Sequence, residues 1–161
     1  MRGHRIGSGV DAHRLASGRL LVLGGVEVAH DQGLEGHSDG DCVTHALCDA
    51  LLGAAAAGDL GEHFPSSEPR WKGASSLIFL EQVARLVDGK GFAVENVDLT
   101  VIAQRPALAP YVRQMRLKLS DCLGLDPERV SVKVKSTDGL GAFGRGEGIA
   151  ALATALLREK A

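Results

Sequence analysis

The sequence predicts an α/β fold, a two-layer α/β sandwich in which helices pack on one face of a mixed sheet. Stretches in which apolar residues alternate with polar ones indicate strands, and stretches in which apolar residues return every three or four positions indicate helices. Both kinds of stretch are mixed along a chain of 161 residues, without a linker or an internal repeat between them. We therefore expect one domain, residues 1–161, with its own core.

Five short segments have the composition or alternation of strands. Gly24-Gly25 interrupts one of them, which predicts a bulge or a hairpin-like kink. The alanine-rich tail, residues 148–157, fits either a helix or a last strand, and its periodicity leaves both open. The expected strands are residues 5–14, 19–23, 26–28, 94–103 and 130–135.

Three longer segments have the periodicity of amphipathic helices, and we expect them at residues 41–57, 74–87 and 110–123. Ser38 or Asp39 is expected to cap the first helix. Residues 32–40 and 58–65 are polar or glycine-rich and are expected to be loops. The apolar stripe of the first helix consists of Val43, Ala46, Leu47, Ala50, Leu51 and Ala54.

The composition excludes several classes of partner. A net charge of −2, without charged blocks, gives no electrostatic basis for binding nucleic acid or an anionic membrane. Aromatic residues make up 4% of the chain, too few for a platform that stacks bases. No segment resembles a membrane span or a signal peptide. Three cysteines without a C-x-x-C pair suit reduced thiols, so we expect a cytoplasmic protein.

A candidate metal site can be read from two separate segments. Asp11 and His13 are two residues apart in an expected strand, so their side chains leave the same face. His45 lies one turn into the first expected helix. Two nitrogen ligands and one oxygen ligand are typical of an open zinc site, in which a fourth position is free for substrate or water.

An ordered set of motifs makes a family resemblance specific. These motifs extend from about residue 5 to the C-terminus, and in this order they closely resemble 2-C-methyl-D-erythritol 2,4-cyclodiphosphate synthase. They are G-V-D-A-H, H-S-D-G-D, H-A-L-C-D-A-L-L-G-A-A, G-D-L-G, F-P, D-L-T-V-I-A-Q and G-L-G-A-F-G-R-G-E-G-I-A.

The resemblance implies an enzyme of the non-mevalonate route to isoprenoid precursors. It would cyclise 4-diphosphocytidyl-2-C-methyl-D-erythritol 2-phosphate to 2-C-methyl-D-erythritol 2,4-cyclodiphosphate and release CMP, as a phosphorus–oxygen lyase. It also implies a homotrimer with active sites between subunits, one zinc ion per site and a Mg²⁺ or Mn²⁺ ion on the substrate diphosphate. The location would be the cytoplasm, or the plastid of a plant or alga.

The same resemblance assigns roles to individual residues. Zinc would be held by Asp11, His13 and His45, and the second metal by Asp138. His37 and Ser136 would be catalytic, each stabilising the transition state. Substrate would be bound by Asp11, Ala12, His13, His37, Ser38, Asp59, Leu60, Gly61, Phe64, Glu68, Ala103, Arg105, Leu108, Lys135, Ser136, Thr137, Asp138, Ala142 and Arg145.

Elementary chemistry agrees with this reaction. The 2-phosphate must attack the β-phosphorus within one molecule, so the protein has to neutralise anionic oxygens and hold an in-line geometry. A single carboxylate such as Asp138 suits Mg²⁺, because phosphates and water supply the other ligands of this ion.

Asp49 follows His45 by one helical turn and is expected either to orient that histidine or to be solvated. His4, His30 and His63 are expected to be solvated.

Some positions depart from the family pattern. In the segment 103–107, Ala107 stands where a lysine is common near the nucleotide, and Arg105 is expected to supply that charge. Ala142-Phe143 reverses the order of residues that is common in the family's Gly-Phe-x-Gly-Arg stretch. Arg145 and Glu147 fit either an ordinary ion pair or the lining of a trimer axis.

Two other functions remain open at the level of sequence. A zinc hydrolase would use metal-bound water on a nucleotide diphosphate, although Glu62 and Glu68, its candidate bases, lie in expected loops. A non-catalytic domain would close a structural zinc site with Cys42, three residues before His45 on the same helix.

Overall fold

A five-stranded mixed sheet forms one layer of the molecule. The computed structural model describes residues 3–161, and its strand order is β4-β1-β7-β5-β6. β5 and β6 are parallel, and the other pairs are antiparallel. The strands are β1 (His4–Ser17), β4 (Gln32–Leu34), β5 (Phe92–Ile102), β6 (Val130–Lys135) and β7 (Gly148–Glu159). β2 (Leu21–Leu23) and β3 (Val26–Val28) form a separate hairpin around Gly24-Gly25, which confirms the expected kink.

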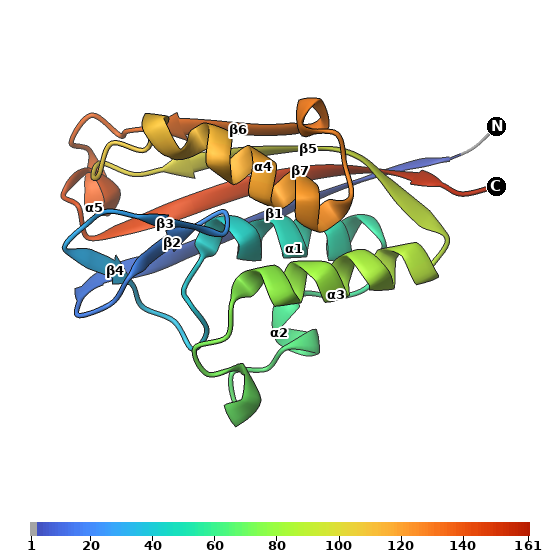
Figure 1. The fold of residues 1–161 in the computed structure, drawn as a ribbon, viewed down its shortest axis with the longest axis horizontal. Coiled ribbons are helices and arrows are strands. Elements are labelled where there is room, and N and C mark those ends of the chain that lie inside the picture. Colours follow the sequence, from blue (N-terminus) through green and yellow to red (C-terminus); the bar gives the residue numbers. More distant parts are fainter. Residues whose placement is uncertain (1–2) are drawn as a thin grey trace.

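The helices cover one face of this sheet, as the fold class predicted (Figure 1). α1 (Cys42–Ala54) packs on β1 and β7, α4 (Val112–Leu123) packs on β6, and α3 (Ser76–Gly89) lies beside both helices. Short helical turns complete the chain. They are α2 (Leu60–His63), α5 (Gly141–Gly144) and the 3₁₀ turns η1 (Pro69–Trp71), η2 (Ala109–Tyr111) and η3 (Pro127–Arg129).

The core lies between the sheet and α1. All six apolar residues expected on one stripe of this helix are buried, but so are Cys42, Thr44 and His45, because α3 covers the side that faces away from the sheet. On β7, Ala151, Ala153 and Ala155 are buried at alternate positions. A helix buried nearly all round places its few polar groups out of contact with solvent.

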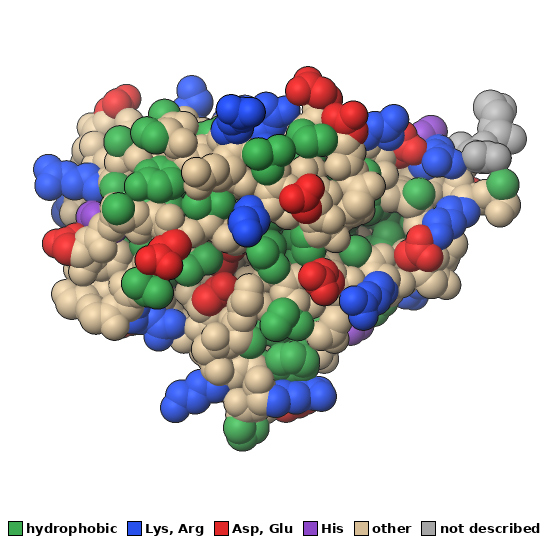
Figure 2. Space-filling view, in the orientation of Figure 1, with side chains coloured by type: hydrophobic (Ala, Val, Ile, Leu, Met, Phe, Trp, Pro, Cys, Tyr) green, Lys and Arg blue, Asp and Glu red, His purple; other side chains and the backbone are tan. Residues whose placement is uncertain are grey.

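The opposite face of the sheet carries exposed apolar side chains. Ile6 and Val10 of β1 are 71% and 65% exposed, and Leu152 of β7 is 44% exposed. On the helical face, by contrast, acidic and basic side chains are interspersed (Figure 2). No helix within residues 3–161 is both long and apolar enough to cross a bilayer.

Several local expectations were wrong. Gln32–Leu34, expected in a loop, pairs with the end of β1, and Leu60–His63, also expected in a loop, forms α2. The cap of α1 is Asp41 rather than Ser38 or Asp39, because its carboxylate accepts hydrogen bonds from the N–H groups of Val43 and Thr44. The tail is a strand, since β1 and β5 pair with it on both sides.

Candidate metal centre and substrate site

β1 and α1 bring three metal-binding side chains together. Asp11 and His13 point from β1 toward α1, and His45 lies in the first turn of that helix. The two backbones approach closely because glycines of β1 face the helix. A Cβ on Gly9 would lie 2.0 Å from the carbonyl oxygen of Ala46, a distance that no side chain tolerates. The glycine therefore allows a strand residue and a helix residue to share one site.

The three ligand atoms are close enough to hold one ion. Asp11 Oδ2 lies 2.7 Å from His13 Nε2 and 3.0 Å from His45 Nδ1, and the two nitrogens are 3.4 Å apart. Ligands about 2.0–2.2 Å from a tetrahedral zinc ion lie about 3.3 Å from one another. Among residues 3–161 this is the one group of three His, Cys, Asp or Glu side chains with such proximity. The donor set and its spacing fit zinc.

The electrostatics of this cluster favour a bound cation. Burial opposes ionisation of Asp11, but hydrogen bonds with His13 and His45 outweigh it, so the pKa of this carboxyl lies well below its ordinary value. The hydrogen bond with Asp11 raises the pKa of His13 against the effect of burial. A half-buried carboxylate thus stays charged between two imidazoles.

Cys42 does not belong to the cluster. It is fully buried at the start of α1, and burial raises the pKa of its thiol well above the ordinary value. Its sulfur is not among the ligand atoms that come together with Asp11. The closed four-ligand zinc site considered for a non-catalytic domain is therefore not formed in residues 3–161.

Asp49 does not orient His45, so the first of the two alternatives for this residue was wrong. Its carboxylate accepts a hydrogen bond from the N–H of Leu60 at 2.7 Å and thereby fixes the start of α2. The second ring nitrogen of His45, Nε2, instead lies 2.8 Å from Ser76 Oγ and 3.1 Å from Ser38 Oγ. No motif or spacing indicated Ser76, which belongs to α3.

A cavity of about 170 Å³ adjoins the metal cluster. Aromatic rings form one wall: Phe64 stacks on Phe79 with a centroid distance of 4.6 Å, and Trp71 meets Phe79 edge-on at 5.4 Å. Trp71 and Phe79 were not expected at the site, since Phe79 fits the core stripe of an amphipathic helix equally well. The lining residues are His13, His37, Ser38, His45, Leu60, Phe64, Ser66, Trp71 and Phe79.

Neighbouring loops hold the polar side of this cavity. His37 Nε2 lies 3.1 Å from the carbonyl oxygen of Glu68, and Arg19 donates to the carbonyl of Ser38 at 3.0 Å. Asp59 caps α2 by accepting from the N–H of Glu62 at 3.0 Å. Gly61 is exposed on the same turn. The side chain of Glu68 pairs with Arg70.

The other histidines differ in their surroundings. His4 is exposed, as expected, whereas His30 and His63 are partly buried. His63 Nε2 lies 2.7 Å from the carbonyl oxygen of Ala57, and His30 lies beside Asp31. The expectation that all three are solvated is therefore wrong for His30 and His63.

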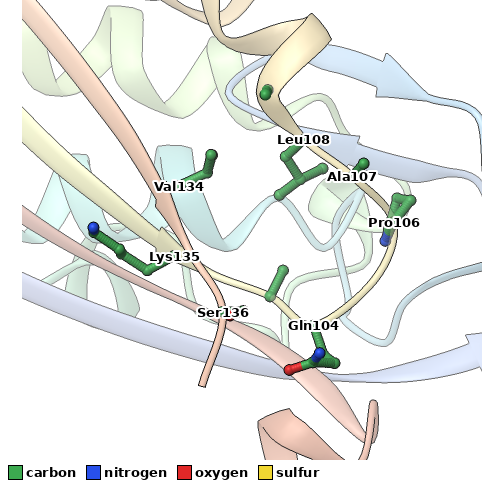
Figure 3. A pocket seen from close by; sticks show the side chains of 9 residues that line it. Gln104, Pro106, Ala107, Leu108, Val134, Lys135 and Ser136 are labelled. Carbon is green, nitrogen blue, oxygen red and sulfur yellow. The ribbon is translucent and has the colours of Figure 1, made fainter. Parts of the chain in front are cut away.

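A second cavity, of about 250 Å³, lies at the ends of β5 and β6 (Figure 3). It is formed by residues 103, 104 and 106–109 on one side and 134–136 on the other. Leu108 is buried, whereas Arg105 is exposed and does not line the cavity. The N–H of Gly139 donates to Gln104 Oε1 at 3.2 Å, which ties the two loops together.

The loop after β6 carries the expected second metal ligand. Ser136 Oγ donates to Asp138 Oδ1 at 3.1 Å, and Thr137 Oγ1 donates to the carbonyl of Leu140 at 2.8 Å. Asp138 is exposed, with a left-handed φ of 51°. Its carboxylate accepts the hydrogen bond of Ser136 and lies at the surface.

The two cavities are well separated within one chain. β1 and β6 are three strand positions apart in the sheet, or about 14 Å. Asp138 is accordingly absent from the metal cluster of Asp11. Ala12 points to the other side of β1 and, with Ala142 and Phe143, lines a third hollow. Arg145 pairs with Glu147 at 2.6 Å near that hollow.

Comparison with known proteins connects this geometry with one group of enzymes. The model of the YgbB family matches residues 4–158. The chain is 53% identical to the 2-C-methyl-D-erythritol 2,4-cyclodiphosphate synthase of Syntrophomonas wolfei, over 96% of this chain and 99% of the relative. It is 56% identical to the synthase of Laribacter hongkongensis, over 97% of this chain and 96% of the relative.

Solved structures agree. A CDP complex of the Plasmodium falciparum enzyme IspF superposes with a TM-score of 0.87 at 34% identity, covering 100% of this chain and 99% of that one. The bifunctional IspDF of Campylobacter jejuni gives a TM-score of 0.95 at 38% identity, and the match covers 99% of this chain and 43% of that protein.

Proposed function

The chain belongs to the YgbB family, and from this premise we propose that it is a cyclodiphosphate synthase of the non-mevalonate pathway. It converts 4-diphosphocytidyl-2-C-methyl-D-erythritol 2-phosphate into 2-C-methyl-D-erythritol 2,4-cyclodiphosphate and releases CMP. The reaction closes a ring between two phosphates of one molecule, which makes the enzyme a phosphorus–oxygen lyase.

One observation carries this proposal. Asp11, His13 and His45 converge on a point that opens into a cavity with an aromatic wall. When bound there, zinc supplies Lewis acidity to a phosphate oxygen. Three protein ligands leave a coordination position for that oxygen, which a closed structural site would not.

The cavity beside the cluster suits the methylerythritol 2-phosphate part of the substrate. Phe64 and Phe79 exclude water around the carbon skeleton, while His37 and Ser38 bind the phosphate. The carbonyl of Glu68 accepts from Nε2 of His37, so the ring has one fixed orientation and its Nδ1 faces away from Glu68. We assign His37 the stabilisation of charge in the transition state.

The cavity at the ends of β5 and β6 suits the cytidine diphosphate. Ala103 and Leu108 provide an apolar surface, and Lys135, Ser136 and Thr137 provide donors for phosphate oxygens. Asp138 would hold Mg²⁺ or Mn²⁺, which supplies charge neutralisation on the diphosphate as CMP leaves.

Both cavities must serve one substrate, and this supports a homotrimer with sites between subunits. Within one chain β1 and β6 are separated by about 14 Å across the sheet, and we infer that a neighbouring subunit brings its β6 loop next to the Asp11 cluster. The exposed apolar face with Ile6, Val10 and Leu152 offers the contact surface. Light scattering should give three times the chain mass, and an active monomer would contradict the assembly.

Product analysis tests the function directly. The purified protein, incubated with zinc, Mg²⁺ and the cytidyl substrate, should release CMP together with a product whose mass corresponds to the cyclic diphosphate. A zinc hydrolase would yield a product heavier by one water molecule. The absence of any turnover with this substrate would refute the proposal.

A further inference from the structure

The ring nitrogen of His45 that faces away from the metal cluster begins a buried hydrogen-bonded chain. His45 Nε2 lies 2.8 Å from Ser76 Oγ, and the Ser76 hydroxyl donates to the carboxylate of Asp39. Ser76 has no exposed surface. The chain therefore links α1 to α3 and to the loop before α1 without passing through solvent.

Counting hydrogens along this chain places a hydrogen on Nε2 of His45. An ionised carboxylate only accepts, so the single hydroxyl hydrogen of Ser76 is used on Asp39. Ser76 Oγ is then left as an acceptor, and the short contact with His45 requires a hydrogen on Nε2. With this hydrogen on Nε2, Nδ1 is the nitrogen whose lone pair would bind a metal ion, in place of the hydrogen bond that it makes with Asp11 at 3.0 Å.

We infer that Ser76 and Asp39 are positioning residues of the metal site, which hold His45 in its Nε2–H tautomer and fix the direction of Nδ1. Metal-ligating histidines commonly donate their second N–H to a carboxylate or another acceptor, and losing that partner weakens metal binding. Here the carboxylate acts through a serine from another helix. The inference rests on the metal site of the proposed function and adds to it two residues outside the ligand set.

The surroundings of Asp39 show that it is itself held in place. Its Oδ2 accepts from the N–H of Ser76 at 2.9 Å, and its Oδ1 accepts from the N–H of Asp41 at 3.1 Å. Its own N–H donates to the carbonyl of Ala74 at 3.0 Å. Asp39 thus fixes both the start of α3 and the hydroxyl that His45 contacts.

Zinc binding, measured without substrate, tests the inference. In competition with a chromophoric chelator, Ser76→Ala should weaken zinc binding about tenfold or more. The matched control is Ser75→Ala: Ser75 is exposed at the cap of α3 and makes no side-chain capping bond, so its zinc affinity should equal that of the wild type. With Co²⁺ in place of zinc, the visible spectrum should change for Ser76→Ala and not for Ser75→Ala.

A double-mutant cycle separates positioning from a merely structural effect. Asp39→Asn should also weaken zinc binding, but not further once Ser76 is alanine, because both act through the same hydroxyl. If Ser76→Ala fails to fold, Asp39→Asn alone must show the loss. Zinc affinities equal to wild type, or strictly additive losses, would overturn the inference. A wild-type protein that binds no zinc would overturn the metal site as well, whereas normal zinc binding without turnover would contradict only the proposed reaction.

Discussion

The metal cluster and the β6 loop, two parts of the same proposed site, are built in opposite ways. Asp11, His13 and His45 are each buried or half-buried, and their neighbours are held by hydrogen bonds from α1, α3 and the loop between them. Ser136 and Asp138 are exposed and bond mainly to each other. The chain itself orders the metal cluster, whereas under the proposed function the β6 loop would gain its partners from substrate, metal and a neighbouring subunit. Mutations in the metal cluster should therefore change the affinity for zinc. Mutations in the β6 loop should change the concentrations of Mg²⁺ and substrate that turnover requires.

The largest effect is expected from a mutation at the centre of the metal cluster. His45→Ala should abolish stoichiometric zinc binding and lower CMP release on the order of a thousandfold, because Lewis acid catalysis contributes several kcal/mol. Metal analysis and a CMP assay measure both quantities, and circular dichroism checks that the chain stays folded. Activity within a few-fold of wild type would show that the zinc assignment is wrong.

A smaller effect is expected from a mutation where the backbones of β1 and α1 approach each other beside that cluster. Gly9→Ala places a Cβ 2.0 Å from the Ala46 carbonyl oxygen and should lower the free energy of unfolding by about 3 kcal/mol, since β1 and α1 must move apart. Chemical denaturation measures this loss, and the zinc affinity should fall with it.

Gly53→Ala provides the matched control for this variant. The nearest atom to a Cβ on Gly53 lies 3.9 Å away, and alanine favours the helix by about 0.5–1 kcal/mol. This variant should be as stable as the wild type or more so. Equal losses for both variants would mean that the close approach of β1 and α1 does not determine stability.

The smallest expected effect concerns the exposed loop. Asp138→Asn should raise the Mg²⁺ concentration needed for half-maximal rate by about tenfold, because the ion loses its charged carboxylate ligand. The remaining ligands would be phosphate oxygens and water. Zinc stoichiometry should not change. Excess Mg²⁺ should restore part of the rate, which a titration of initial rates will show.

Ser136→Ala is the control in the same loop. It should lower the rate without moving the Mg²⁺ titration, since its hydroxyl serves the transition state and not the metal. Loss of zinc from Asp138→Asn, or a Mg²⁺ titration identical to wild type, would contradict the division of the two metals between the two regions.

Much of this molecule follows from local sequence. The alternation of residues 130–135 predicted β6 at its observed bounds, and the stripe of α1 predicted its buried face. The D-x-H spacing was enough to place Asp11 and His13 on one side of a strand. The family resemblance read from the ordered motifs is confirmed by the match to the family model. Several motifs in one order are more specific than any single position, which can vary.

Other features depended on tertiary structure. The alanine-rich tail has helix propensity, but pairing with β1 and β5 makes it a strand, and its small side chains let α1 lie close to the sheet. Asp49 satisfies the local spacing for a partner of His45, yet Ser76, distant in sequence, takes that position. Periodicity and spacing indicate which face of an element a residue occupies, and they predicted the fold class and the candidate metal cluster of Asp11, His13 and His45. Which groups meet across two elements is decided by packing, because hydrogen bonds between distant segments leave no periodic trace in the chain.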